Sequence, residues 1–343
     1  MDEMVTIYDI AKRASVSPMT VSRVINHTGN TRESTRKKVE KAIKELGYVP
    51  NAAARSLTSN QSNNLALLLP DISNPFFSKI ARGAEDEAAK KGYRLLLSNT
   101  DESREKEVHY IDSVLSARVD GVLLAPTCDH SIKQIERLTA HKIPVVLIDR
   151  TIAAFNGDYV IGDSYIGSRR LMEHLISLGH ERVAFINGPL SISTSRERKR
   201  GYCETLKLNE LPVYDHYISE VDYNSESVAD IIERLYALPK MKRPTAIFAA
   251  NNLIAINTIR ALKDMNLQVP EDVSIVCFDE VEPVVYFDPF FTVAAQPAQE
   301  FGRIGIQFLI EHVQQKMTTE ARKVVLQPNI HIRKSTRVIK RSK

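Results

Sequence analysis

The stretch "TIYDIAKRASVSPMTVSRVIN", residues 6–26, predicts two short helices joined by a tight turn. Thr6 and Asp9 have the spacing of a capping box, in which each side chain accepts a hydrogen bond from the other residue's backbone N–H. Ser17 and Pro18 mark a second helix start, because serine caps a helix and proline loses no hydrogen bond at the first helical position. The alternation of apolar and polar residues then leaves a polar, basic face on the second helix.

A third helix is expected from about Thr31 to Leu46, and Gly47 suits the residue that ends it. Three short helices with a polar, basic second helix indicate a helix-turn-helix. The competing interpretation is a small helical subdomain with a solvated charged face, which the pattern alone leaves open.

This segment and "TRKKVEKAIKELGYVPNAAARSL", residues 35–57, closely resemble the DNA-binding headpiece of the LacI/GalR family of bacterial transcription regulators. The resemblance implies a headpiece over residues 1–48 that binds double-stranded operator DNA. Two departures are Ser15, where a turn glycine is usual, and Thr31-Arg32 at the start of the third helix. The residues that the resemblance places at the DNA are Tyr8, Ser17, Pro18, Met19, Thr20, Ser22, Arg23, Asn26, Thr35 and Tyr48.

Residues 49–62 are expected to be a hinge and linker. The helix expected over "AAARSL" is too short to be stable alone in water. The resemblance implies that residues 51–57 fold when two copies pair on DNA, and that Leu57 opens a central base step from the minor groove. Leu57→Ala should therefore weaken operator binding and leave sugar affinity unchanged. The hinge residues expected at the DNA are Asn51, Ala54, Arg55 and Leu57.

Composition and charge fit a globular protein with an anionic partner at one end. The 343 residues are enough for two or three domains, and their 43% apolar and 26% charged content is ordinary. The net charge is +4, and residues 1–60 alone carry that +4; residues 333–343 add six basic side chains and no acid. The sequence has no apolar run near 18 residues and no export signal, so a cytoplasmic location is expected and no membrane partner. The three cysteines lack CxxC spacing and are expected to be reduced and buried.

From Leu65 onward, apolar strands alternate with amphipathic helices, which predicts doubly wound parallel sheets. Seven strands are expected at "LALLL", "RLLLS", "DGVLLA", "PVVLI", "RVAFI", "TAIFA" and "VSIVCF", with helices including 77–91, 164–178, 225–237, 252–265 and 298–315. So many strands over about 270 residues suit two sheets. The fold class expected is an all-α helix-turn-helix headpiece followed by an α/β core of two such subdomains.

Polar residues follow four of these strands and predict a ligand site at one sheet edge. They are Asp71 and "SNPFF", then Asp149 with Arg150, then Asn251 with Asn252, and then Asp279. Paired carboxylates, guanidiniums and amides suit the hydroxyls of a neutral sugar, and aromatic rings cover its C–H face. One of the adjacent rings of Phe76 and Phe77 is expected to stack on the ligand while the other walls the site.

Residues 62–335 resemble the effector core of the same family, which shares its fold with periplasmic sugar-binding proteins. The pieces "NPFF", "IDR", "SRERKRGY", "AANN", "CFDE" and "AAQP" match the ribose-binding pattern, which implies a ribose-like pentose as effector. Tyr223 stands where the pattern has Phe. The residues expected at the effector are Asn74, Phe76, Phe77, Asp149, Arg150, Arg198, Tyr223, Asn251, Asp279 and Gln296, with Asp163 and Thr194 in second rank.

The core is expected over residues 63–335, as one subdomain of 63–162 with 292–322 and another of 163–291 with 323–335, before a basic tail over 336–343. A ligand-switched homodimeric repressor is the leading hypothesis, with no cofactor and no metal. A regulator that binds a phosphoprotein corepressor near Arg82–Lys91 is the alternative. A sugar-transport component and an enzyme are disfavoured, because the chain has no export signal, P-loop, GxGxxG or HExxH motif.

Overall fold

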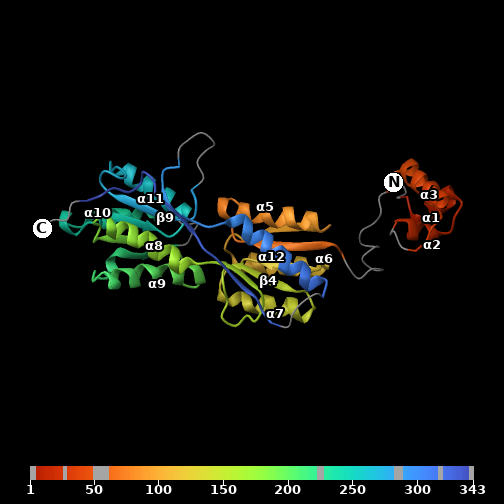
Figure 1. Cartoon of the computed structure of the whole chain (residues 1–343), viewed down its shortest axis with the longest axis horizontal. Coiled ribbons are helices and arrows are strands. Elements are labelled where there is room, and N and C mark those ends of the chain that lie inside the picture. The colour runs from red at the N-terminus through yellow and green to blue at the C-terminus, as the bar shows by residue number, and fades with distance from the viewer. Residues whose placement is uncertain are drawn as a thin grey trace. The chain divides into compact units, whose positions relative to one another are not determined.

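The computed structural model describes residues 5–25, 29–48, 62–221, 228–281, 289–315 and 320–339. The chain divides into two compact units, residues 1–62 and 63–343. Figure 1 labels the elements of both units. We call the first unit the headpiece and the second unit the core.

The headpiece has the helical order predicted from the sequence. Its helices are α1 (Ile7–Ala14), α2 (Pro18–Ile25) and α3 (Glu33–Leu46). The capping box of Thr6 and Asp9 is present, and the Ser17 hydroxyl accepts a hydrogen bond from the Thr20 amide at 3.2 Å. The helix α3 begins two residues later than expected, with Arg32 at its N-cap and no capping side chain.

The headpiece core is small and apolar. Its fully or nearly fully buried side chains come from all three helices, and they are Ile10, Ala11, Ala14, Val21, Val24, Val39 and Ala42. Ser15 ends α1 with a left-handed backbone, at φ 55°, a conformation that glycine adopts at lower cost. The departure from the usual turn glycine therefore keeps the backbone geometry and adds local strain.

The core consists of two six-stranded sheets, which define a first and a second subdomain. The first sheet has the strand order β11-β5-β4-β3-β1-β2, and its strands are all parallel. The elements of the first subdomain are β1 (Asn64–Leu69), α5 (Pro75–Lys90), β2 (Arg94–Asn99), α6 (Arg104–Ala117), β3 (Gly121–Leu124), η1 (Asp129–Ser131), α7 (Ile132–Ala140), β4 (Val145–Asp149), β5 (Tyr159–Gly162), α12 (Ala298–Val313) and β11 (Lys323–Leu326).

The second sheet has the order β12-β10-β9-β8-β6-β7, and β12 is its only antiparallel strand among the described residues. The elements of the second subdomain are α8 (Ser164–Ser177), β6 (Val183–Asn187), α9 (Ser193–Leu208), η2 (Asp215–Tyr217), β7 (Ile218–Glu220), α10 (Val228–Ala237), η3 (Lys240–Lys242), β8 (Ala246–Ala249), α11 (Asn252–Asp264), β9 (Ser274–Phe278), β10 (Thr292–Ala295) and β12 (Asn329–His331).

Helices cover both faces of the first sheet. On β1, Leu65, Leu67 and Leu69 belong to the apolar cluster of α5 and α12, while Ala66 and Leu68 belong to the cluster of α6 and α7. This alternation follows from the two-residue period of a strand. Figure 1 shows α5 and α12 together on one side of β4 and α7 on the other. The predicted doubly wound α/β class is therefore confirmed for the core.

The chain passes between the two subdomains at residues 162–164, 295–298 and 326–329. These crossings correct the expected boundaries at two strands. Residues 292–295 form β10 in the second sheet rather than the first, and 323–326 form β11 in the first sheet rather than the second. Short strands near a crossing carry too few residues for their pattern to indicate which sheet they join.

The basic tail was expected to begin at residue 336, but the chain still packs on the core at that point. The Ile339 amide donates to the Leu178 carbonyl at 2.9 Å, and the Arg337 carbonyl lies 3.1 Å from the His180 imidazole. Residues 336–339 therefore pack on the second subdomain, while 340–343 lie outside the described residues.

Of the three cysteines expected to be buried, only Cys277 is fully buried. Cys128 and Cys203 are half-buried free thiols.

Candidate functional site

The exposed face of α2 carries the headpiece side chains that the sequence places at DNA. Met19 is 66% exposed, and Arg23, four residues on, lies on the same helix face and is also exposed. An exposed methionine this close to an exposed arginine is not core packing, since Val21 and Val24 fill that role. The arrangement leaves this face of α2 available to a partner.

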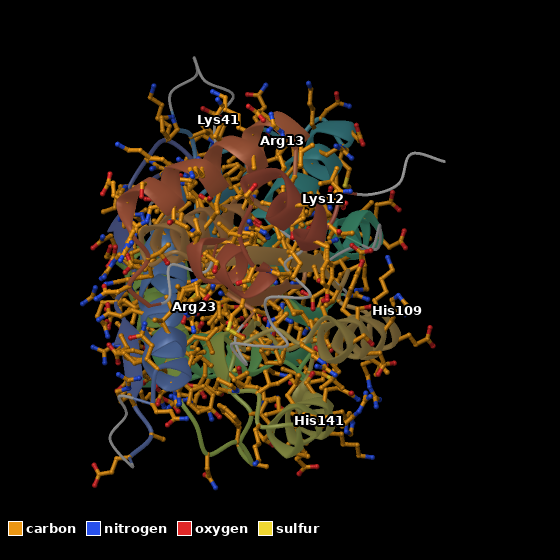
Figure 2. The ribbon with its side chains drawn as sticks, turned by 90° about the vertical axis from the view of Figure 1, so that its right-hand side faces the viewer. Lys12, Arg13, Arg23, Lys41, His109 and His141 are labelled. Atoms are coloured by element: carbon orange, nitrogen blue, oxygen red, sulfur yellow. The ribbon has the colours of Figure 1, made fainter. Side chains whose placement is uncertain are left out.

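Other headpiece side chains add polar and basic groups. Tyr8 on α1 is 70% exposed, and Thr35 and Tyr48 are half-buried. Figure 2 labels the basic side chains Lys12, Arg13, Arg23 and Lys41. Basic side chains on a small helical unit are the usual electrostatic requirement for binding a phosphate backbone. Asn26 and the hinge residues Asn51, Ala54, Arg55 and Leu57 lie outside the described residues.

The core holds a small cavity at the carboxyl ends of the strands, between its two subdomains. Its volume is about 30 Å³, enough for about two water molecules. A sugar therefore requires the two subdomains or their side chains to move apart before it enters. The lining residues are Asp71, Asn74, Phe76, Phe77, Glu102, Asp149, Arg150, Thr194, Arg198, Asn251, Leu253 and Asp279.

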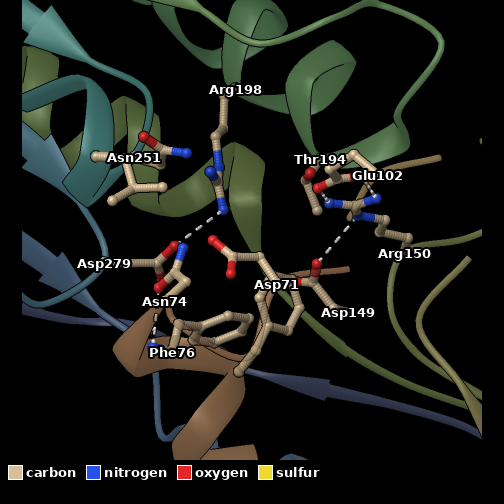
Figure 3. A pocket seen from close by; sticks show the side chains of 12 residues that line it. Asp71, Asn74, Phe76, Glu102, Asp149, Arg150, Thr194, Arg198, Asn251 and Asp279 are labelled. Atoms are coloured by element: carbon tan, nitrogen blue, oxygen red, sulfur yellow. Dashed lines mark hydrogen bonds and ion pairs between the residues drawn. The ribbon is translucent and has the colours of Figure 1, made fainter. Parts of the chain in front are cut away.

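Two aromatic rings form one wall of the cavity (Figure 3). Asn74 caps α5 by accepting a hydrogen bond from the Phe76 amide at 3.0 Å, which fixes where the helix begins. The Phe76 and Phe77 rings meet edge to face, with centroids 5.1 Å apart, and Phe76 also packs on Phe301. Both rings are buried and both line the cavity, so the adjacent pair serves one site.

On one side of the cavity, Arg150 is held by carboxylates. Its guanidinium donates two hydrogen bonds to Glu102, at 2.7 and 2.5 Å, and a third to the Pro126 carbonyl. Its Nε lies 3.5 Å from Asp149 Oδ2. Burial raises the pKa of Asp149 to about 6, although the neighbouring Arg150 and Arg198 guanidiniums oppose the rise.

On the other side, Arg198 is tied to the second subdomain. It donates to the Ala250 carbonyl at 2.6 Å, lies 3.6 Å from Asp279 and stacks over the Phe278 ring at 3.9 Å. Its Nε has no hydrogen-bond partner among the described residues, so a donor is left for a ligand. Burial also raises the pKa of Asp279, against the opposing effect of Arg198 and of the Gln296 hydrogen bond.

The two carboxylates occupy equivalent strained positions. Asp149 ends β4 and Asp279 follows β9, and their φ angles are 64° and 66°. A residue with a Cβ pays about 1–2 kcal/mol in this left-handed region. Strain of this kind is concentrated at functional sites, where the surrounding structure holds a side chain in place.

A contact across the cleft joins the two walls. The Asn74 Oδ1 that caps α5 also accepts a hydrogen bond from Asn252 Nδ2 at 2.9 Å. Asn251, the preceding residue, caps α11 by accepting from the Ile254 amide. Each wall is therefore anchored at the start of a helix.

Comparisons with known proteins agree with both units. Residues 6–51 match the family "Bacterial regulatory proteins, lacI family", and residues 62–336 match "Periplasmic binding proteins and sugar binding domain of LacI family". The chain belongs to the LacI family. It is a DNA-binding transcription regulator with a helix-turn-helix headpiece and a ligand-binding core.

Individual family members are similar over nearly the whole chain. Catabolite control protein A of Priestia megaterium is 36% identical over 97% of this chain and 99% of that protein. The ribose operon repressor of Escherichia coli K12 is 34% identical over 93% and 96%. The structure of the lac repressor dimer bound to operator and the anti-inducer ONPF superposes with a TM-score of 0.84, at 27% identity over 98% and 100%.

The structure brings nine of the residues expected at the effector of this LacI-family core onto one cavity. They are Asn74, Phe76, Phe77, Asp149, Arg150, Thr194, Arg198, Asn251 and Asp279. Gln296 does not line it, but its Nε2 donates to Asp279 at 2.7 Å. Asp163 does not line it either, because its carboxylate caps α8 and accepts from Gln327. Tyr223 lies outside the described residues.

Sequence reasoning missed Glu102 and Leu253, and left Asp71 out of the effector residues. Glu102 follows β2, so the strand-end rule that found Asp149 and Asp279 would have found it as well. Leu253 follows Asn252 in the first turn of α11. With these residues the cavity has four carboxyl groups and two guanidiniums, which is a poor environment for a phosphorylated ligand.

The described residues include no helix long and apolar enough to cross a membrane.

Proposed function

We propose that this protein is a homodimeric repressor of sugar-utilisation genes, which a ribose-like pentose releases from a pseudo-palindromic operator. The observation that carries the proposal is the cavity between the subdomains. There two phenylalanines packed edge to face, two buried guanidiniums and buried carboxylates converge at the strand ends. Rings for C–H faces and charged groups for vicinal hydroxyls are what a neutral sugar needs.

The switch follows from where the lining residues sit. The first subdomain provides the rings, Asp149 and Arg150, while the second provides Arg198, Asn251 and Asp279. A ligand that contacts both sets stabilises the closed arrangement over the open one, which is the differential affinity that a switch requires. Coupling of this kind is typically about 1–3 kcal/mol, enough to change operator occupancy several-fold or more.

Exposed leucines on an edge strand support a homodimer. Leu96 is 42% exposed and Leu97 is 48% exposed, and both lie on β2 at the edge of the first sheet. An apolar edge strand is a liability unless something covers it. The solved lac repressor is a dimer on its operator, so we assign a second copy to this edge. Leu97→Lys should shift sedimentation toward monomer, whereas Leu208→Lys, at an exposed leucine on α9, should not.

A thermal-shift and calorimetry panel of pentoses, hexoses and their phosphates tests the effector. Ligand at about 100 times its dissociation constant should add about 2.7 kcal/mol to the free energy of unfolding. D-Ribose or a near epimer should stabilise the protein, and the corresponding phosphates should not. Stabilisation by phosphorylated sugars only, or by no sugar, would refute the pentose assignment.

The second candidate is a catabolite-type regulator that binds a phosphoprotein corepressor, and its support is the similarity to catabolite control protein A. The helix expected to bind it, α5, is an unpromising anion site. Arg82 is already paired with Asp86 at 3.1 Å, and Lys90 lies 3.9 Å from Glu87. If no sugar stabilises the protein, pull-down with a phosphorylated bait against its unphosphorylated form would test this candidate.

A further inference from the structure

A second and much larger cavity adjoins the small cavity of the proposed sugar site, which we call the sugar cavity. Its volume is about 520 Å³, within the range of about 300–1,000 Å³ that small-molecule sites occupy. We call it the outer chamber, and its lining residues are Asp101, Glu102, Ser103, Arg104, Thr127, Cys128, His130, Pro189, Ser191 and Ile192. Because Glu102 lines both cavities, they share a wall at this residue.

The outer chamber lies at the same strand ends as the sugar cavity. Asp101 and Glu102 follow β2, Thr127 and Cys128 follow β3, and Ile192 lies between β6 and α9. The first subdomain and the second subdomain therefore each form one lip. In Figure 3 Glu102 and Arg150 face each other at one side of the sugar cavity, opposite Asp279.

An ion pair joins the two lips. Arg196 donates to both carboxylate oxygens of Asp129, at 2.9 and 3.1 Å, and also to the Leu190 carbonyl at 2.8 Å. Asp129 lies between the lining residues Cys128 and His130, and Leu190 between Pro189 and Ser191. In this closed arrangement the chamber is thus bounded by both subdomains rather than being a hollow on one of them.

The lining chemistry suits an uncharged ring. The buried residues are Thr127 and Ile192, and Pro189 adds a flat apolar surface. Hydroxyls from Ser103, Thr127 and Ser191 provide hydrogen bonds. The two acidic groups are compensated, because Asp101 pairs with Lys106 and Glu102 pairs with Arg150, while Arg104 and His130 are exposed side chains of the lining.

We propose that the outer chamber is a second subsite, which binds a neutral ring attached to the pentose, so that the natural effector is a pentoside. The proposal rests on the proposed sugar site. The pentose would occupy the sugar cavity once its walls have moved apart to admit it, and the linkage would pass Glu102, whose carboxylate is held in place by Arg150. An effector of this size uses the contact area of both cavities, whereas a free pentose leaves the chamber to water.

Isothermal titration calorimetry on the full-length protein tests the proposal with three probes. D-Ribose measures binding in the sugar cavity alone, and methyl β-D-ribofuranoside measures whether the site accepts a substituent at the linkage position. Uridine carries a neutral ring with polar edges. Uridine should bind at least tenfold more tightly than D-ribose. Ser191→Trp, which fills the exposed rim of the chamber, should weaken uridine at least tenfold and change D-ribose less than twofold. Ser177→Trp, at an exposed serine of α8, is the matched control and should change neither.

The outcomes separate the two proposals. If D-ribose binds and uridine binds more weakly, the pentoside subsite is wrong and the sugar site stands. If Ser191→Trp weakens D-ribose and uridine equally, the residue acts on closure and the subsite is again wrong. If a folded wild-type protein binds none of the three probes, the ribose-like pentose and the subsite both fail.

Discussion

The helix α2 of the headpiece and the cavity of the core hold their candidate functional side chains in opposite environments. On α2, Met19 and Arg23 are exposed to solvent. In the cavity, the Arg150 and Arg198 side chains are only 4% exposed, and each is already paired with a carboxylate. An exposed contact residue adds nothing to folding, whereas a buried charged one is part of the packed core. Substitutions in the two regions should therefore separate function from stability to very different extents.

Arg198→Ala should have the largest effect, because it leaves Asp279 and the Ala250 carbonyl buried without their partner. Breaking a buried pair costs about 3–5 kcal/mol, and sugar affinity should fall at least about 100-fold with it. Denaturant unfolding and calorimetry with D-ribose measure both losses. Arg169→Ala is the control, because it breaks the exposed pair with Glu173 in the same subdomain. Equal losses in the two variants would contradict the contrast drawn here.

Arg23→Ala should affect binding without affecting folding. A single bidentate base contact is worth about 1–3 kcal/mol, so affinity for an operator selected from a random library should fall about 10- to 100-fold. The midpoint of unfolding should stay unchanged, because the side chain is exposed. Anisotropy titrations against the selected operator and a scrambled duplex measure the effect. Loss confined to the selected operator indicates base recognition; equal loss on both duplexes would reduce Arg23 to a phosphate contact.

What could be predicted differs between the two regions for a physical reason. The headpiece pattern is local, since Thr6 with Asp9 and Ser17 with Thr20 interact within one helical turn. The cavity depends on strand order, and β2 and β4 are not adjacent in the first sheet. The strand-end rule still found Asp149 and Asp279, because parallel strands end at one edge. The same rule applies to Glu102 after β2, but its ion pair with Arg150 joins residues 48 positions apart and could not be predicted from the sequence pattern.

Subdomain membership was the hardest feature to predict. The strands β10 and β11 have four residues each, and each lies next to a crossing of the chain. Their apolar pattern is satisfied in either sheet, so only the pairing of β10 with β9 and of β11 with β5 assigns them. Gln296 has the same difficulty, since it lies at a crossing and reaches the site through Asp279.

Sugar affinity should depend on pH through the buried carboxylate Asp149. Its pKa is raised to about 6 by burial, so the carboxylate that we propose accepts hydrogen bonds from the sugar is mostly protonated at pH 5. D-Ribose affinity should fall about tenfold between pH 7 and pH 5. Stability without ligand should move the other way. A carboxyl whose pKa is raised on folding favours the folded state below that pKa, and the gain from pH 7 to pH 5 is about 1 kcal/mol.

Calorimetry and denaturant unfolding at both pH values measure the two trends. Asp149→Asn cannot ionise at this position, so its affinity should be lower and should depend less on pH than that of the wild type. A wild-type affinity that is constant from pH 7 to pH 5 would show that this group does not titrate in the site. The headpiece provides the contrast, because Asp9 is exposed and the hydrogen bonds from Thr6 lower its pKa.

The smallest effect should come from a residue that contacts no ligand. Ser15 adopts φ 55° at the end of α1, where glycine avoids a cost of about 1–2 kcal/mol. Glycine also gains about 0.5–1 kcal/mol of freedom in the unfolded chain, so Ser15→Gly should stabilise the headpiece by a net amount of about 0.5 kcal/mol. Ser15→Ala keeps the Cβ and the strain, and should give no gain. Hydrogen exchange of the α1 amides in the full-length protein compares the two; greater protection in the alanine variant than in the glycine variant would contradict the strain argument.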